Sequence, residues 1–102
     1  MDKVLQLLSL AQRAGKVASG EFKTEESVKA YKAALVVVAG DASDNTKKKF
    51  ENMCEYYKVP ILIYSDKENL GHFIGKEFRA SLAVLDSGLA TKILSEHNSN
   101  EV

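Results

Sequence analysis

The residue types that suggest chemistry most directly fall in one short segment, Gly75-Lys76-Glu77-Phe78-Arg79. Lysine and arginine can clamp phosphates, and a phenylalanine ring can stack on a base that is splayed out of its helix. This mixture is typical of a loop that faces a nucleic acid. The alternative is an ordinary loop with Phe78 turned into the core, and the local sequence leaves both interpretations open.

Two further segments carry clustered cations. Lys47-Lys48-Lys49 lies near the start of a predicted helix, where the helix dipole disfavours positive charge by about a few tenths of a kcal/mol. Such a run is usually a solvated helix face, but the small penalty favours a role in binding a partner. The segment 12–16 places two more cations at the end of a helix.

Catalytic chemistry has little support in the sequence. Asp41 directly follows an apolar strand, where an aspartate can serve as a nucleophile or a magnesium ligand, but no phosphate-binding loop or second acid accompanies it. Its alternative role is a turn residue or helix cap. His72 and His97 lack neighbours at metal-ligand spacing, and Cys54 falls on an apolar helix face. We therefore expect no catalytic residue, no metal and no cofactor.

The composition predicts a folded domain and leaves the partner open. The chain has 102 residues, of which 45% are hydrophobic, and its single cysteine cannot form an internal disulfide, which fits a reducing cytoplasm. We expect a soluble protein with no signal peptide and no membrane span. Lysine and arginine number 14 and aspartate and glutamate also 14, so the net charge is zero. Nucleic-acid binders usually have a basic surplus, although a neutral domain can still present one basic face.

Hydrophobic periodicity predicts helices that alternate with strands. We expect helices over 2–14, 21–32 and from Ser43 or Asp44 to Pro60, then from a Ser65 cap to Gly75. A last helix is expected after Asp86-Ser87-Gly88, to about Glu96. Val28 and Tyr31 should point inward from the second helix. Strands are expected at 35–39, 61–64 and 81–85, with a short extended piece at 16–19.

This alternation predicts an α/β fold, a three-layer α/β/α sandwich with a mixed central sheet of about four strands. We expect a single domain over residues 1–97 and a frayed tail over 98–102. In such sheets the loops at the strand ends carry function. Here these loops are 40–45, 65–69 and 75–79.

Taken in order, these segments resemble a known family, the kink-turn RNA-binding proteins related to ribosomal protein 7Ae, and within it the bacterial YlxQ-type branch. The resemblance runs from Leu7 to Leu94. Its most specific pieces are Leu8-Ser9-Leu10-Ala11-Gln12-Arg13-Ala14-Gly15-Lys16, Ser19-Gly20-Glu21 and the segment 35–49, followed by Tyr57-Lys58-Val59-Pro60, the segment 67–71, Ile74-Gly75-Lys76 and Asp86-Ser87-Gly88-Leu89-Ala90.

The resemblance implies a sandwich that binds a sharply bent RNA helix. In the family, a G-x-N-E-x-x-K segment enters the RNA groove, and a later loop covers a flipped-out nucleotide. Gly20 matches the glycine, Lys67 a lysine that faces the RNA backbone, and Asp41 the acid of an A-x-D motif. Residues 75–79 match the covering loop.

The chain departs from the family motif next to this glycine. Phe22-Lys23 stands where the family has Asn-Glu, and Glu26 stands where it has lysine. A carboxylate accepts hydrogen bonds from guanine, and a lysine cannot. Phe22 could instead stack on a base, which contributes about 1–3 kcal/mol.

Our hypothesis is a non-catalytic, cytoplasmic accessory protein that binds structured RNA, with ribosomal RNA and possible contacts to ribosomal proteins as partners. No small-molecule substrate is expected. Phosphate contacts would come from lysine and arginine, stacking from phenylalanine, and close approach from glycine. The expected RNA-binding residues are Gly20, Glu21, Phe22, Lys23, Glu26, Asp41, Lys67, Gly75, Lys76, Glu77, Phe78 and Arg79. Two alternatives stay open: a protein-interaction module of the same fold that has lost kink-turn binding, and a small phosphoryl-transfer or hydrolase domain using Asp41.

Overall fold

A computed structural model of the chain describes residues 2–99. A four-stranded mixed sheet forms the middle layer, with the strand order β1-β4-β2-β3. The pair β2–β3 is parallel, and β4 runs antiparallel to both of its neighbours. The strands are β1 (Val17–Ser19), β2 (Leu35–Val38), β3 (Ile61–Ile63) and β4 (Ser81–Val84).

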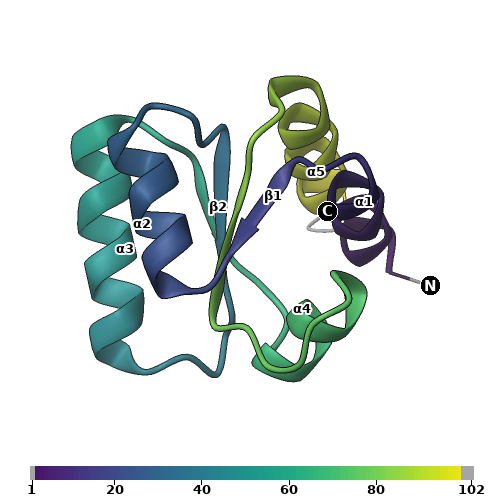
Figure 1. The fold of residues 1–102 in the computed structure, drawn as a ribbon, viewed down its shortest axis with the longest axis horizontal. Coiled ribbons are helices and arrows are strands. Elements are labelled where there is room, and N and C mark those ends of the chain that lie inside the picture. Colours follow the sequence, from purple (N-terminus) through teal and green to yellow (C-terminus); the bar gives the residue numbers. More distant parts are fainter. Residues whose placement is uncertain (1, 100–102) are drawn as a thin grey trace.

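Helices cover both faces of this sheet (Figure 1). They are α1 (Lys3–Arg13), α2 (Glu21–Lys29), α3 (Asp44–Tyr57), α4 (Lys67–Phe73) and α5 (Ser87–Ser99). In Figure 1, α2 and α3 lie on one side of the sheet and α1, α4 and α5 on the other. The predicted three-layer α/β/α sandwich with a mixed sheet of four strands is therefore confirmed.

The two central strands explain why the apolar runs were informative. Every residue of β2 and of β4 is buried, because helices pack on both faces of these strands. The largest fully buried side chains come from the sheet and from both helical layers, and include Leu8, Leu35, Phe50, Leu70, Leu82 and Ile93. A continuous run of apolar residues is the pattern of a strand covered on both faces.

Helix starts follow capping chemistry, with one correction to the expectation. The Ser43 hydroxyl accepts a hydrogen bond from the Thr46 amide at 3.1 Å, so Ser43 caps α3. The expected Ser65 cap of α4 is wrong, because Asp66 is the cap and its carboxylate accepts from the Asn69 amide at 2.7 Å. Ser65 instead has a φ of 58°, in the left-handed region. Its carbonyl oxygen accepts a hydrogen bond from Gly40 N at 2.9 Å. Aspartate also interacts favourably with the positive end of the helix dipole.

The end of α2 also differs from the expectation. The helix ends at Lys29, and Tyr31 is 78% exposed instead of pointing inward with Val28. Tyr31 has a φ of 59°, which turns the chain back toward β2, and the amides of Lys32 and Ala33 both bond to the Ser27 carbonyl. This tight reversal takes Tyr31 off the helical face that the periodicity assigned to it.

At the C-terminal end, α5 extends to Ser99, into the segment 98–102 that we expected to be frayed. The rest of that segment lies outside the described residues. Within residues 2–99, no helix combines the length and apolarity needed to cross a membrane.

Candidate nucleic-acid interface

The segments expected to carry function meet at one edge of the sheet. Because β1, β2 and β3 point the same way and β4 points the opposite way, the carboxyl ends of three strands lie beside the amino end of β4. Backbone hydrogen bonds join these ends: Gly20 N donates to Ser81 O, and Ala39 N donates to Ala80 O, both at 2.9 Å. The start of α2 and the loops 40–45, 65–69 and 75–79 therefore surround this edge.

The loop 75–79 is held against α4 by its backbone. Lys76 N donates to Gly71 O at 2.8 Å, and Arg79 N donates to Lys67 O at 3.0 Å. A Cβ on Gly71 would lie only 1.2 Å from the Glu77 carbonyl oxygen, so no larger residue fits at this position without displacing the loop. The loop is thus packed on the helix through a glycine contact.

Three cations gather where this loop faces the start of α2. Lys23, Lys76 and Arg79 line one cavity of about 530 Å³ together with Gly20 and Ser19. Arg79 Nε donates to Ser19 Oγ at 3.3 Å and its Nη1 donates to the Phe78 carbonyl at 2.8 Å, which fixes the guanidinium. Within residues 2–99, none of these three cations forms an ion pair. The one acid in the lining, Glu21, is paired with Lys49, so the cavity carries a surplus of positive charge.

Glycine at position 20 keeps this cavity open. Gly20 has a φ of 94°, in the region that favours glycine, and it precedes α2 without a side-chain cap. A Cβ placed on it would meet nothing within 4 Å, so the space in front of it is free. A backbone without a side chain allows close approach of a ligand.

One exposed aromatic ring lines the cavity with the cations, and a second precedes Arg79 in the chain. Phe22 is 75% exposed and lines the cavity from α2, while Phe78 is 63% exposed on the loop 75–79. The alternative in which Phe78 turns into the core is therefore wrong. Exposed aromatic rings offer faces on which bases can stack.

The acids on the other flank of α2 are paired with lysines, and one of them, Glu21, also borders the cavity. Lys49 Nζ lies 3.1 Å from Glu21 and 2.7 Å from Glu25, and Lys29 lies 2.8 Å from Glu25. Hydrogen bonds from Lys29 and Lys49 lower the pKa of Glu25 to about 2, and hydrogen bonds to Glu25 and Glu21 raise the pKa of Lys49. One cation of the 47–49 run thus attaches α3 to α2.

Glu26 lies apart from the three cations. It lines a separate hollow of about 430 Å³ with Phe22, Glu25 and Lys29. Phe22 borders both hollows and so stands on the ridge between them. The exchange of Lys23 and Glu26 relative to the family motif therefore puts the cation on the cavity side of the ridge and the acid on the opposite side.

Asp41 and Lys67 are joined at this edge by a hydrogen bond to the Lys67 backbone. The Asp41 carboxylate accepts a hydrogen bond from Lys67 N at 2.9 Å, so it caps the first turn of α4. Lys67 O in turn accepts from Arg79 N. The two residues link the end of β2 to the loop 75–79, in line with the structural alternative considered for Asp41.

Groups suited to catalysis do not assemble here. Burial raises the pKa of the Cys54 thiol to about 11, which disfavours the nucleophilic thiolate. The His72 ring packs edge-on against the Phe73 ring, with the ring centres 5.4 Å apart. Within residues 2–99, no three histidine, cysteine or acidic side chains are grouped so that they could hold a metal ion.

The cavity also contains residues that the sequence reasoning did not select as site residues. Ser19 orients Arg79, and Gln12 joins the lining from α1. Ser19 reaches this place because it pairs with Leu82 in the antiparallel β1–β4 ladder. No local motif signals that pairing, so only the sheet topology could have identified Ser19.

The chain has relatives that match it over most of its length. The sequence profile of the ribosomal protein L7Ae/L30e/S12e/Gadd45 family matches residues 2–94. The RNA-binding protein YlxQ of Bacillus subtilis (strain 168) is 46% identical over 89 residues, which cover 87% of this chain and 89% of that protein. The RNA-binding protein YlxQ of Enterococcus faecium is 40% identical over 91 residues, covering 89% and 87%.

Solved structures share the fold. A protein of unknown function from Bacillus halodurans C superposes with a TM-score of 0.93 at 33% identity, over 96% of this chain and 99% of that one. The Giardia lamblia 15.5kD RNA binding protein has a TM-score of 0.80 at 19% identity, over 99% and 90% of the two chains, and so supports the fold alone. The chain belongs to the ribosomal protein L7Ae/L30e/S12e/Gadd45 family.

Proposed function

We propose that this protein binds structured RNA, a kink-turn or a ribosomal RNA element, as a non-catalytic, ribosome-associated accessory protein of the cytoplasm. The observation that carries the proposal is the cavity around Gly20, where three cations without ion pairs stand beside exposed phenylalanines. Family membership and relatives that are named RNA-binding proteins support the same function.

In this proposal the cations contact phosphates. Lys23, Lys76 and Arg79 neutralise the RNA backbone, and each phosphate contact releases counterions. Arg79 is held in place by its bonds to Ser19 and to the Phe78 carbonyl, so it loses little conformational freedom on binding. Gly20 lets the RNA backbone approach the start of α2.

Recognition in this proposal depends on shape and stacking. Lysine at position 23 cannot accept hydrogen bonds from guanine, so the contact there shifts from base edges to phosphate. Phe22 and Phe78 supply stacking faces on two sides of the cations. Glu26 faces a separate hollow, which keeps its carboxylate out of the cavity with the cations.

The test is a titration of the purified protein against a kink-turn RNA, a pool of ribosomal RNA fragments and an unrelated hairpin, at two salt concentrations. Binding should be salt-dependent and should prefer structured RNA. The double variant Lys76→Ala/Arg79→Ala should bind more weakly, and its salt slope should fall by about two at most. The control Lys32→Ala/Lys48→Ala removes two exposed cations elsewhere and should change binding much less. Unchanged binding of the first double variant would refute the placement of the site.

A protein-interaction module of the same fold is the second candidate. The paired acidic flank formed by Glu21, Lys49 and Glu25, next to the exposed ring of Phe22, favours it. This function predicts a salt-insensitive association with a protein and no retarded RNA band. The same titration distinguishes the two candidates.

A further inference from the structure

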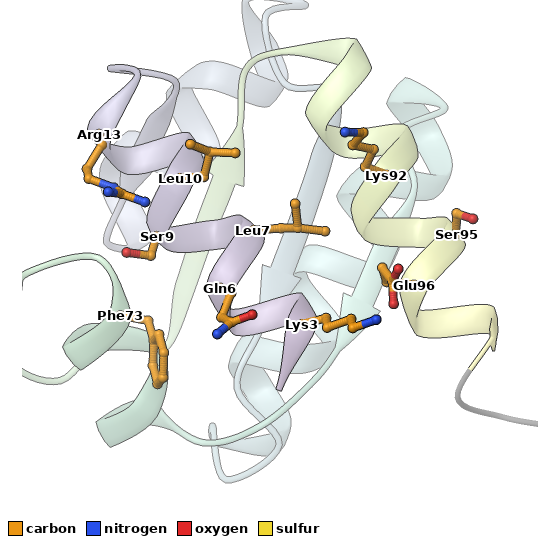
Figure 2. Close-up of a pocket in the computed structure, with 10 residues that line it drawn as sticks. All are labelled: Lys3, Gln6, Leu7, Ser9, Leu10, Arg13, Phe73, Lys92, Ser95 and Glu96. Carbon is orange, nitrogen blue, oxygen red and sulfur yellow. The ribbon is translucent and has the colours of Figure 1, made fainter. Parts of the chain in front are cut away.

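A second hollow lies along the outward face of α1, and it shares no lining residue with the cavity around Gly20. Its volume is about 610 Å³, and it extends from α4 across α1 to α5. Figure 2 shows Leu7 directed from α1 toward α5, Leu10 one turn further along the helix, and Phe73 on the α4 side. We call this surface the α1–α5 groove.

The floor of the groove is apolar although α1 already buries one face. Val4, Leu8 and Ala11 are fully buried against the sheet. Leu7 is half-buried, and Leu10 is 43% exposed on the outward side. The helix therefore has a second, narrower apolar stripe that the described part of the chain leaves partly open to solvent.

Cations border this stripe at both ends. Lys3 lies in the first turn of α1 and Arg13 in the last, which places them about 15 Å apart along the helix axis. Lys92 faces them from α5 (Figure 2). Within residues 2–99, none of their three side chains forms a hydrogen bond or an ion pair, and Glu96 is the one acidic residue in the lining.

We propose that the α1–α5 groove docks an acidic amphipathic helix of a partner protein. Apolar side chains one turn apart on that helix would cover Leu7 and Leu10, as in other helix-in-groove contacts. Carboxylates before and after them, about ten residues apart, would meet Lys3 and Arg13, and a third would meet Lys92.

The chemistry of the groove favours a protein over RNA. Its cations are separated by branched aliphatic side chains, which offer no face for base stacking. Its aromatic residue, Phe73, is partly buried against the core and packs edge-on against His72. The cavity around Gly20 differs, because its cations stand beside exposed rings. A positively charged rim around an aliphatic floor complements a helix with an apolar stripe bounded by acids.

The test uses the full chain labelled with ¹⁵N and a synthetic helical peptide with leucines on one face and glutamates flanking them at both ends. A twin peptide carries lysine at every glutamate position. The glutamate peptide should shift amide signals of α1, α5 and Phe73, and the lysine twin should not. Shifts confined to α2 and the loop 75–79, or equal shifts from both peptides, would overturn the proposal.

Charge reversal sharpens the test. Arg13→Glu/Lys92→Glu should weaken binding of the glutamate peptide roughly tenfold and improve binding of the lysine twin. Leu10→Ser should weaken binding of both peptides. Lys48→Glu reverses an exposed charge on α3 and should leave binding of both peptides unchanged. Thermal melts of each variant establish that it is folded. Undiminished binding by the charge-reversed variant would refute the assigned groove.

The same measurements distinguish two other occupants of the α1–α5 groove, a structured RNA and a second copy of the chain. If a structured RNA shifts the α1 and α5 amides and Arg13→Glu/Lys92→Glu weakens RNA, the groove belongs to the RNA interface. If the same amides shift on dilution of the chain alone, the occupant is a second copy. Either result overturns the proposal.

Discussion

The two flanks of the first turns of α2 have opposite electrostatic arrangements. On one flank Lys23, Lys76 and Arg79 share a cavity, and none forms an ion pair within the described residues. On the other flank Lys49 holds Glu25 at 2.7 Å and also Glu21, which borders the cavity, at 3.1 Å. The same short helix therefore carries acids that are neutralised beside cations that are not.

This difference explains how a neutral chain can present a basic surface. The 14 cations and 14 acids of the sequence cancel in sum, but two acids, Glu21 and Glu25, are paired with Lys29 and Lys49, which lie outside the cavity lining. What remains at the cavity is positive. Net charge is therefore a poor guide to partner type when ion pairs are concentrated on one side of an element.

The largest expected effect comes from removing the glycine contact that supports the cationic flank. Gly71→Ala puts a Cβ at 1.2 Å from the Glu77 carbonyl oxygen, so the loop 75–79 must move. We expect a loss of about 3 kcal/mol in the free energy of unfolding and loss of RNA binding. Urea denaturation and RNA titration measure the two effects.

Gly88→Ala is the matched control for this substitution. Gly88 lies in the first turn of α5, and a Cβ added to it would meet only the Asp86 side chain, at 3.3 Å. Alanine is also the better helix former, so the free energy of unfolding should change by less than about 1 kcal/mol. A Gly71→Ala variant as stable as the Gly88→Ala variant would contradict the packing described for the loop.

The next effect separates binding from stability on the cationic flank. Phe78→Ala removes a ring that is 63% exposed, so the free energy of unfolding should change by about 0.5 kcal/mol or less. RNA binding should weaken by about 1–3 kcal/mol if the ring stacks on a base. Phe22→Ala provides the parallel measurement on the other side of the cations. If neither variant weakens RNA binding, stacking is not part of recognition.

A smaller effect is expected on the paired flank. Lys49→Met removes both of its ion pairs, and we expect a loss of about 0.5–1 kcal/mol in unfolding free energy, as is usual for partly exposed pairs. The pKa of Glu25 should rise toward its ordinary value of 4.5. Carboxyl chemical shifts during an acid titration report that pKa. Lys48→Met, the neighbouring exposed lysine, should leave both quantities unchanged.

The smallest effect is the pH dependence that this pairing produces. Glu25 has a folded pKa of about 2, below its ordinary value of 4.5, because Lys29 and Lys49 stabilise its charged form. Its contribution to stability is therefore present above pH 4.5 and is lost as the pH falls toward about 2. Urea midpoints of the native chain should fall more steeply across this window than those of Lys49→Met. Parallel curves would show that the pair contributes nothing to stability.

Much of the fold could be predicted because its signals are local. The apolar runs that became β2 and β4 were predicted to be strands, and Ser43 was one of two predicted caps for α3. The errors arose where tertiary constraints prevailed. Tyr31 continues the helical periodicity, but the return to β2 requires a left-handed turn there, and Ser65 was needed for a backbone bond to Gly40.

The candidate site was less predictable because its parts are distant in sequence. The loop 75–79 and Gly20 were found from residue types and from the family resemblance. Ser19 and the Lys49 pairs were not found, since these contacts join residues 60 and 28 positions apart. Helical periodicity and motif spacing carry no information about such contacts.

The position of β4 has a consequence for how the protein is made. This strand lies between β1 and β2 in the sheet, yet it is the last of the four to be synthesised. Until Ser81 has left the ribosome, Gly20 lacks its backbone partner and the loop 75–79 has no strand to lead into. A nascent chain therefore cannot assemble the cationic surface early, and newly made protein gains it only when nearly the whole domain has emerged.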